Sequence, residues 1–264
     1  MAQSVERFSS RVKNYAKYRP GYPAAIIDLL TSECGLSSNS VVADIGSGTG
    51  KLSEIFLENG NVVFGIEPNA EMRASAEQIL HGYSTFRSIE GTAESTTMAP
   101  ASIDFVTAGQ AFHWFEPDKA RAESIRILKA EGWAVLIWNE RLTDTTPFLR
   151  DYERFLLEYG TDYQEVRHEN ASEAIAKFFA PVVNELKTFA NSQEFDYEGL
   201  KGRVLSSSYT PEPQDSRFEP MLQSLEEIFA KHERLGRVSF DYVTKLYYGH
   251  LGKRQFIESA HSSL

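Results

Sequence analysis

A glycine-rich turn that directly follows a short apolar run constrains the fold of this chain more than any other feature. The run 41–45 ends in three glycines at alternate positions, Gly46, Gly48 and Gly50, and a helical pattern begins at Lys51. This pattern is typical of a buried parallel strand that enters a tight turn before a helix. Glycines let the backbone approach a ligand, and the free N–H groups of a helix N-terminus attract polar or anionic groups. The turn therefore predicts a site for a nucleotide-like molecule, with an ordinary loop as the alternative.

The spacing of the glycines separates two kinds of nucleotide-like ligand. The dinucleotide fingerprint G-x-G-x-x-G requires a glycine or another small residue at position 51, and this chain has Lys51 there. A dinucleotide, and with it a dinucleotide-dependent oxidoreductase, is therefore disfavoured.

Composition limits the partners of the chain. At 264 residues it is long enough for one large domain, and 27 basic against 37 acidic residues give a net charge of −10. This charge disfavours nucleic acid and anionic membranes as partners. Cys34 is the single cysteine, so neither an intrachain disulfide nor a cysteine-rich metal site is expected, and we predict no bound metal. With no signal-peptide pattern and no apolar stretch of membrane-spanning length, we expect a cytoplasmic protein. The sequence does not indicate an oligomeric state.

Strand and helix patterns alternate in the first half of the chain. We predict an amphipathic helix at 4–18, a helix at 24–33, strands at 41–45, 62–67, 84–89, 103–108 and 133–138, and intervening helices at 51–59, from 69 onward, and at 117–129. This alternation predicts an α/β fold with a parallel sheet covered by helices on both faces, whose ligands bind at the carboxyl ends of the strands. After residue 140 we predict helices at 147–160, 171–179, 197–207 and 218–235 and strands at 183–189 and 238–251.

Chemically distinctive residues follow three of the predicted strands. Glu67 ends the second strand, where a carboxylate can accept hydrogen bonds from both hydroxyls of a ribose. Glu94 follows the third strand, where it can accept from an adenine amino group. The run 109–115 follows the fourth strand and combines three aromatic residues with His113. Aromatic side chains shape apolar pockets, and the alternative for this run is a cluster in the core. For Glu67 and Glu94 the alternative is a solvated position at the surface.

Together these motifs resemble the class I S-adenosylmethionine-dependent methyltransferases. The resemblance rests on the segments 44–50, Glu67-Pro68-Asn69 with Met72, Ala93-Glu94 and 110–114, and it covers about residues 5–140. It implies S-adenosyl-L-methionine as cofactor and a Rossmann-like seven-stranded sheet of order 3-2-1-4-5-7-6, with strand seven alone antiparallel and with helical insertions. The late strands at 183–189 and 238–251 would then be strands six and seven. The segment 15–23 and the pair His113-Trp114 are most similar to the small-molecule branch that includes trans-aconitate methyltransferase.

The resemblance also implies roles for residues around the cofactor. The glycine turn would wrap the methionine part, Glu67 would bind the ribose, Met72 would pack near the adenine, and Asp44 would accept from the amino group directly or through water. Arg19 is the candidate for the carboxylate, because a guanidinium binds that group with two parallel hydrogen bonds; a surface arginine at a helix end is the alternative. The full set of expected cofactor-binding residues is Arg19, Asp44, Gly46, Ser47, Gly48, Thr49, Gly50, Glu67, Pro68, Met72, Ala93, Glu94, Gln110 and Ala111.

The methyl acceptor is less constrained than the cofactor. Tyr18, His113 and Trp114 are the candidate acceptor contacts, and His113 is also the candidate catalytic residue. A carboxylate acceptor needs no base, whereas a hydroxyl or an acidic carbon needs one, and the pKa of a histidine suits that role. His113 as a base, as a donor to a substrate carboxylate and as a packing residue are three interpretations that stay open.

Two further expectations concern function and domain organisation. Nucleic-acid amino methyltransferases of this fold usually carry an Asn/Asp-Pro-Pro-Tyr/Phe tetrad after strand four, and this chain has the run 109–112 instead. We therefore expect methyl transfer to a small molecule, with O-methylation of a carboxylate as one candidate and a non-catalytic, cofactor-binding regulatory protein as the alternative. We expect one domain over 1–264, made of an N-terminal lid (1–23), a cofactor-binding core (24–140) and a part (141–264) that completes the sheet and supplies a helical substrate cap.

Overall fold

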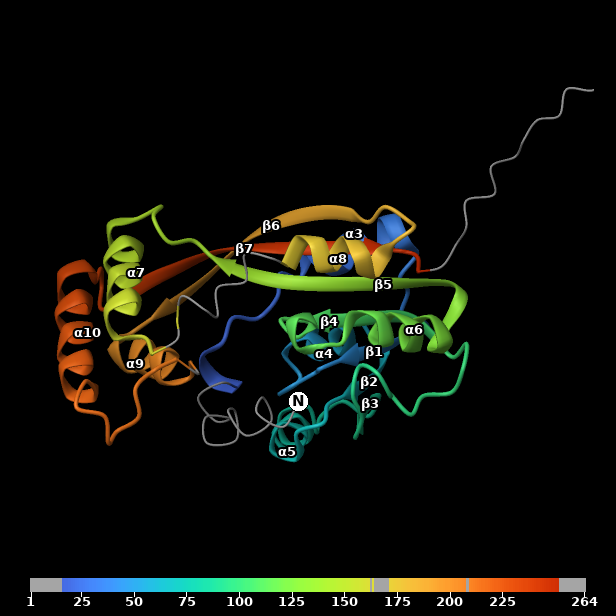
Figure 1. Ribbon diagram of the computed structural model, residues 1–264, viewed down its shortest axis with the longest axis horizontal. Coiled ribbons are helices and arrows are strands. Elements are labelled where there is room, and N and C mark those ends of the chain that lie inside the picture. The colour runs from blue at the N-terminus through green and yellow to red at the C-terminus, as the bar shows by residue number, and fades with distance from the viewer. Residues whose placement is uncertain (1–15, 162, 164–170, 208, 252–264) are drawn as a thin grey trace, which may run out of the picture.

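A seven-stranded sheet runs through the centre of the protein in the computed structural model, which describes residues 16–161, 163, 171–207 and 209–251 (Figure 1). Its order is β3-β2-β1-β4-β5-β7-β6, and β7 is antiparallel to both of its neighbours while the other adjacent strands are parallel. The predicted fold class, strand order and antiparallel strand seven are confirmed. Most of the helix predicted at 4–18 lies outside the described residues.

The strands are β1 (Val41–Ile45), β2 (Val62–Ile66), β3 (Phe86–Ile89), β4 (Ile103–Gly109), β5 (Leu128–Arg141), β6 (Glu185–Phe195) and β7 (Val238–Gly249). The helices are α3 (Ala25–Cys34), α4 (Lys51–Glu58), α5 (Ala70–Ile79), α6 (Pro117–Ile127), α7 (Pro147–Tyr159), α8 (Ala171–Phe179), α9 (Tyr197–Leu205) and α10 (Phe218–His232), with a short 3-10 helix η1 (Phe112–Trp114).

Helices cover both faces of the sheet because successive strand residues point to opposite sides. Val42 and Phe105 pack with α3 and α4 on one face, whereas Ala43 and Val106 pack with α6 and α8 on the other. The sheet is therefore the middle of three layers, as the alternating pattern predicts.

A third apolar cluster lies at the far end of the long strands β5, β6 and β7. Helices α7, α9 and α10 gather there (Figure 1), and their inner residues, including Leu149, Leu200 and Leu225, pack around Phe240 of β7. We call these three helices the cap.

Two strands extend well beyond their predicted ranges because pairing with a neighbouring strand overrides local sequence preference. β5 begins at Leu128, inside the predicted helix 117–129, because Leu128 pairs with Ile103 of β4. β6 continues to Phe195, six residues past the predicted end at 189, because its polar residues 191–194 pair with residues 239–242 of β7. The extension of β6 lengthens the part of the sheet that joins the core to the cap, whereas the extension of β5 at Leu128 lies at the opposite end of the sheet.

Candidate functional site

The three glycines of the predicted turn lie at the carboxyl end of β1, and they serve two different purposes. All have positive φ, at 68° for Gly46, 56° for Gly48 and 85° for Gly50. A Cβ on Gly46 would come within 2.6 Å of the Ala111 Cβ, and one on Gly50 within 2.5 Å of a Leu80 methyl group. A Cβ on Gly48 would meet nothing within 4 Å. Gly46 and Gly50 thus permit close packing, whereas Gly48 borders open space in which a ligand can approach the backbone.

The two residues that flank Gly48, Ser47 and Thr49, differ in their hydrogen bonding. Ser47 and Gly46 both donate their backbone N–H to the Ile66 carbonyl, which joins the turn to the end of β2. The hydroxyl of Thr49 is buried and has no hydrogen-bond partner among the described residues. A buried hydroxyl in this condition fits a site that receives a polar ligand group.

Asp44 lies beneath the turn and is completely buried. One carboxylate oxygen accepts from the Ser53 hydroxyl at 2.7 Å and the other from the Thr107 hydroxyl at 3.3 Å. Burial raises the pKa of Asp44 to about 7 in spite of these two hydrogen bonds. Asp44 therefore ties β1 to α4 and β4, and its contact with the cofactor's amino group stays a prediction.

Glu67 faces the glycine turn from the end of β2. One carboxylate oxygen accepts from the Gly48 backbone N–H at 3.0 Å and the other from the Asn69 N–H at 2.9 Å, and the residue is 9% exposed. Burial raises its pKa. The structure thus brings together Gly48 and Glu67, which the sequence places far apart.

The residues after Glu67 form the start of α5. Pro68 is exposed, and the Asn69 side chain caps the helix by accepting from the N–H groups of Glu71 and Met72. Met72 is buried on the inner side of α5. The predicted segment is therefore a helix entry held in place beside the glycine turn.

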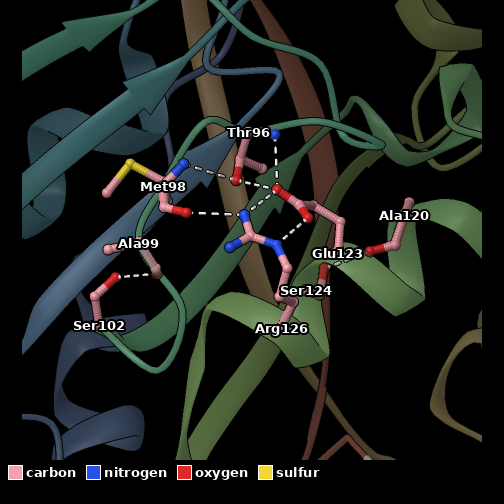
Figure 2. Close-up of polar contacts among 8 residues, drawn as sticks. All are labelled: Thr96, Met98, Ala99, Ser102, Ala120, Glu123, Ser124 and Arg126. Carbon is pink, nitrogen blue, oxygen red and sulfur yellow. Dashed lines mark hydrogen bonds and ion pairs between the residues drawn. The ribbon is translucent and has the colours of Figure 1, made fainter.

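The two predicted residues after β3, Ala93 and Glu94, have different environments. Ala93 is buried in the core, whereas a Glu94 carboxylate oxygen accepts from the Glu116 N–H at 2.9 Å, at the start of α6. The following loop is fixed by Glu123, which accepts from the N–H of Thr96 at 2.8 Å and from its hydroxyl at 2.5 Å (Figure 2). The paired Arg126 guanidinium holds the pKa of Glu123 down at about 2.

Gln110 closes the end of β4 against β5. Its side chain makes two hydrogen bonds to the backbone of Asn139, accepting at 3.1 Å and donating at 3.3 Å, and its φ is 55°. The next residue, Ala111, is buried against Gly46. The structure therefore places both predicted residues after β4 beside the glycine turn.

The aromatic run after Ala111 is split between core and surface. Phe112 is buried and packs edge-on against Phe178 and Trp138. His113 is exposed and Trp114 is 42% exposed, and their ring centroids are 4.7 Å apart. The alternative of a core cluster thus holds for Phe112, while His113 and Trp114 are exposed at the surface.

Residues 18–22, which we call the strap, connect this site to the cap. The Tyr18 ring occupies the space that a Cβ on Gly202 would need, and the Tyr22 ring does the same at Gly109. The Gly21 carbonyl accepts from the side-chain amides of Asn139 and Asn191, both at 3.0 Å. The strap therefore runs from the tip of β4 to helix α9.

Arg19 lies at the cap end of the strap. Its guanidinium donates to the Ser206 carbonyl at 3.2 Å and to the Ser207 hydroxyl at 3.4 Å. These contacts are with the segment that follows α9 and not with the glycine turn, so the predicted contact of Arg19 with the cofactor carboxylate stays a prediction.

Sequence reasoning missed several residues that shape the site. Asn139 follows the predicted fifth strand, so the rule of strand ends, applied once more, would have found it. Ser53 and Thr107, which hold Asp44, and Asn191, which holds the strap, carry no comparable sequence signal. In the described part of the chain, no cluster of three or more potential metal ligands occurs, and no helix has the length and apolar character to cross a membrane.

Comparison with known proteins shows what this chain is similar to. Residues 43–136 match the family model described as a methyltransferase domain. The strand order and the glycine turn with Glu67 opposite are similar to those of the class I S-adenosylmethionine-dependent methyltransferases, a class whose cofactor is S-adenosylmethionine.

Three similar proteins illustrate the extent of the relationship. An uncharacterized methyltransferase-like protein of Schizosaccharomyces pombe is 29% identical over 165 residues, which are 61% of this chain and 63% of that protein. An uncharacterized methyltransferase of Mycobacterium tuberculosis is 36% identical over 138 residues, which are 51% of this chain and 52% of that protein. The solved structure of a proposed type II methyltransferase from Anaeromyxobacter dehalogenans shares the fold, with a TM-score of 0.67 at 18% identity, over 89% of this chain and 100% of that one. The matches to the two relatives thus span between half and two thirds of their lengths.

Proposed function

We propose that this chain transfers the methyl group of S-adenosylmethionine to a small molecule. The observation that carries the proposal is the meeting of Gly48, Glu67 and Ala111 at the carboxyl ends of β1, β2 and β4, with the exposed pair His113 and Trp114 directly beside them. When bound, the cofactor supplies an electrophilic methyl group on a positively charged sulfur.

The chain's own task in this reaction is to align the two reactants. The open space at Gly48 admits the methionine part, and the Thr49 hydroxyl offers a polar contact there. Glu67 lies within reach of a ribose bound over the turn, and the remaining predicted cofactor contacts are proposed with it. Alignment of this kind can supply roughly 7–11 kcal/mol of the barrier as effective molarity.

A carboxylate is our leading candidate for the methylated group. Its oxygen would form the new O–CH₃ bond as the S–CH₃ bond breaks and that electron pair passes to sulfur, so the product is an ester and no proton has to move. In this case His113 needs no catalytic role and orients the acceptor together with Trp114. An alcohol acceptor would instead require His113 as a base.

We propose further that the chain works as one domain. In this arrangement residues 24–140 hold the cofactor, while residues 141–264 complete the sheet and supply the cap. The strap supports the proposal of a single domain, because the hydrogen bonds of Gly21 reach residues of both β5 and β6.

Calorimetry and a transfer assay test the proposal. We expect the protein to bind S-adenosylhomocysteine and not NAD, and to transfer a radiolabelled methyl group from S-adenosylmethionine to a metabolite extract. Release of the label in mild base would identify an ester. Cofactor binding without transfer to any fraction of the extract would instead support the regulatory alternative, and NAD binding alone would contradict the proposal.

A further inference from the structure

A buried arginine in the cap stands out from the other charged side chains of the described residues. Arg203 of α9 is only 6% exposed. One terminal nitrogen donates to the Ser207 hydroxyl at 3.2 Å, while its Nε has no acceptor among the described residues. No carboxylate lies within ion-pair distance of it in the described part of the chain, although a buried charge is costly unless it is paired.

The groups around Arg203 do not supply the missing negative charge. The nearby hydroxyls are those of Tyr152, Tyr209 and Tyr242, and burial raises the pKa of Tyr152, which keeps it neutral. Arg141, a largely buried arginine of the same region, is already paired with Glu153. Arg203 therefore has polar neighbours but no counter-ion among the described residues.

A second guanidinium comes close to the same place. Arg19 of the strap and Arg203 donate to one and the same oxygen, the Ser207 hydroxyl. Burial alone would raise the pKa of the adjacent Tyr209, yet the charges of Arg203, Arg19 and Arg141 and a hydrogen bond to Ser207 together lower it. The local potential is therefore positive, in a chain whose net charge is −10.

The register of the sheet relates Arg203 to the methyl-transfer site. Tyr242, which acts on Arg203, pairs with Arg141, and Thr244 pairs with Asn139. Tyr242 and Thr244 are two residues apart and point to the same face, so their positions are separated by about 6.6 Å at about 3.3 Å per residue. The Thr244 hydroxyl donates to Asn139, whose backbone holds Gln110. A short series of polar residues, from Gln110 through Asn139 and Thr244 to Tyr242, thus links the tip of β4 to Arg203.

We propose that Arg203 binds a carboxylate of the methyl acceptor, so that the acceptor is an organic acid. The fork of a guanidinium matches the two oxygens of a carboxylate, and a bound carboxylate would supply the counter-ion that Arg203 lacks. This inference rests on the proposed function and adds the residue that selects the substrate. The anchored carboxylate lies on the cap side of Asn139, and the group to be methylated extends from there toward Ala111.

Thermal unfolding with small carboxylates tests the site directly. With S-adenosylhomocysteine present, we expect succinate and acetate, titrated to 20 mM against sodium chloride at equal ionic strength, to raise the Tm of the wild-type protein by a few degrees. Arg203→Gln abolishes this rise. The matched control, Arg154→Gln, removes an exposed arginine of α7, and this variant should keep the rise in Tm.

The same variant separates a binding role from a structural one. Removal of a buried charge without a counter-ion is neutral or stabilising, so Arg203→Gln should unfold at the same or a higher temperature than wild type in buffer without carboxylate. If this variant does not fold, Arg203→Lys keeps the charge without the fork, and we expect a carboxylate response well below that of wild type. A lower Tm with an unchanged carboxylate response, or no response in the wild type, overturns the proposal.

Two further arms distinguish this proposal from neighbouring ones. Inorganic phosphate that raises the wild-type Tm more than succinate does would contradict the assignment to a carboxylate. Calorimetry with S-adenosylhomocysteine should give equal affinities for wild type and Arg203→Gln, and a tenfold loss would mean that Arg203 serves the cofactor instead. If the wild type binds no S-adenosylhomocysteine, the proposed function fails, while the carboxylate response measured without it still decides for or against the anion site.

Discussion

The glycine turn and the cap satisfy their polar groups in opposite ways. At the turn, Glu67 is held by the backbone N–H groups of Gly48 and Asn69, and Asp44 by two hydroxyls, so both carboxylates are fully engaged by the chain itself. In the cap, Arg203 is buried with a nitrogen that no described residue engages. The two carboxylates of the turn are thus preorganised before any ligand arrives, with the Thr49 hydroxyl left to receive one, whereas in our proposal the charge of Arg203 is balanced only by a ligand.

In the proposed function this difference separates the cofactor site from the acceptor site. A cofactor that is the same in every turnover suits a rigid site, because rigidity reduces the entropy lost on binding. The acceptor distinguishes one such enzyme from another, and we propose that side chains of the cap recognise it. Four changes to the protein test this difference between the turn and the cap.

The largest effect is expected at the turn. Gly48→Val places a side chain in the space where the cofactor would lie, and we expect at least about a 100-fold loss of affinity for S-adenosylhomocysteine, or about 2.7 kcal/mol. Gly236→Val is the matched control, because Gly236 also has positive φ and open space around it. Both variants should lose similar stability from backbone strain, and calorimetry should show lost binding for Gly48→Val alone. Equal affinities would mean that the turn is not the site.

The second effect is a dependence of stability on pH that originates beneath the turn. The pKa of Asp44 is raised to about 7 in the folded state, so between about pH 4 and pH 7 the folded protein holds a proton that the unfolded chain has lost. Stability contributed by this group is therefore present at low pH and is lost as the pH rises, by about 2 kcal/mol between pH 5 and pH 7.

Urea unfolding at several pH values checks this expectation. Asp44→Asn cannot ionise, so the stability of the variant should change less between pH 5 and pH 7 than that of wild type. The raised pKa of Glu67 acts in the same direction and will leave part of the slope in place. A wild-type protein that gains stability over this range would contradict the assignment.

A smaller effect is expected where the two regions meet. Asn139→Ala removes the donor to the Gly21 carbonyl and the acceptor for Thr244, and we expect a loss of about 1–3 kcal/mol of unfolding free energy. The half-buried Asn184, whose side chain makes one long hydrogen bond at 3.4 Å, provides the control variant Asn184→Ala, with little expected change. Differential scanning calorimetry should rank them in this order, and equal stabilities would show that the strap is not held through Asn139.

The smallest effect on stability is expected at His113. The side chain is exposed, so His113→Gln should change the unfolding free energy by less than about 0.5 kcal/mol. Its effect on transfer distinguishes the open interpretations. If the acceptor group is a carboxylate, kcat should stay within a fewfold of wild type, whereas a drop of about 100-fold or more that depends on pH would identify a base.

The contrast between the glycine turn and the cap also explains which parts of the site could be predicted from the sequence. The glycine turn, Glu67 and Gln110 each follow an apolar strand, so local patterns locate them, and the parallel sheet then brings them together. The order of the seven strands followed from resemblance and is confirmed by the structure.

The helices of the cap were predicted from the sequence and are present, but the buried contacts of their side chains could not be predicted in this way. Arg203 lies in an unremarkable stretch of α9, and its significance depends on tertiary contacts with residues of α7, β7 and the strap. The extension of β6 to Phe195 likewise depends on its pairing with β7, since residues 191–194 alone are typical of a loop. Burial and pairing partners of this kind arise only from contacts over long sequence separations.

The strap has a consequence for the order in which the protein is assembled during translation. The Gly21 carbonyl is held by Asn139, 118 positions later, and by Asn191, 170 positions later. The ribosome therefore synthesises the strap long before either of these partners, and the second hydrogen bond of Gly21 can form only after β6 has left the exit tunnel. Docking of the strap is thus completed late in translation.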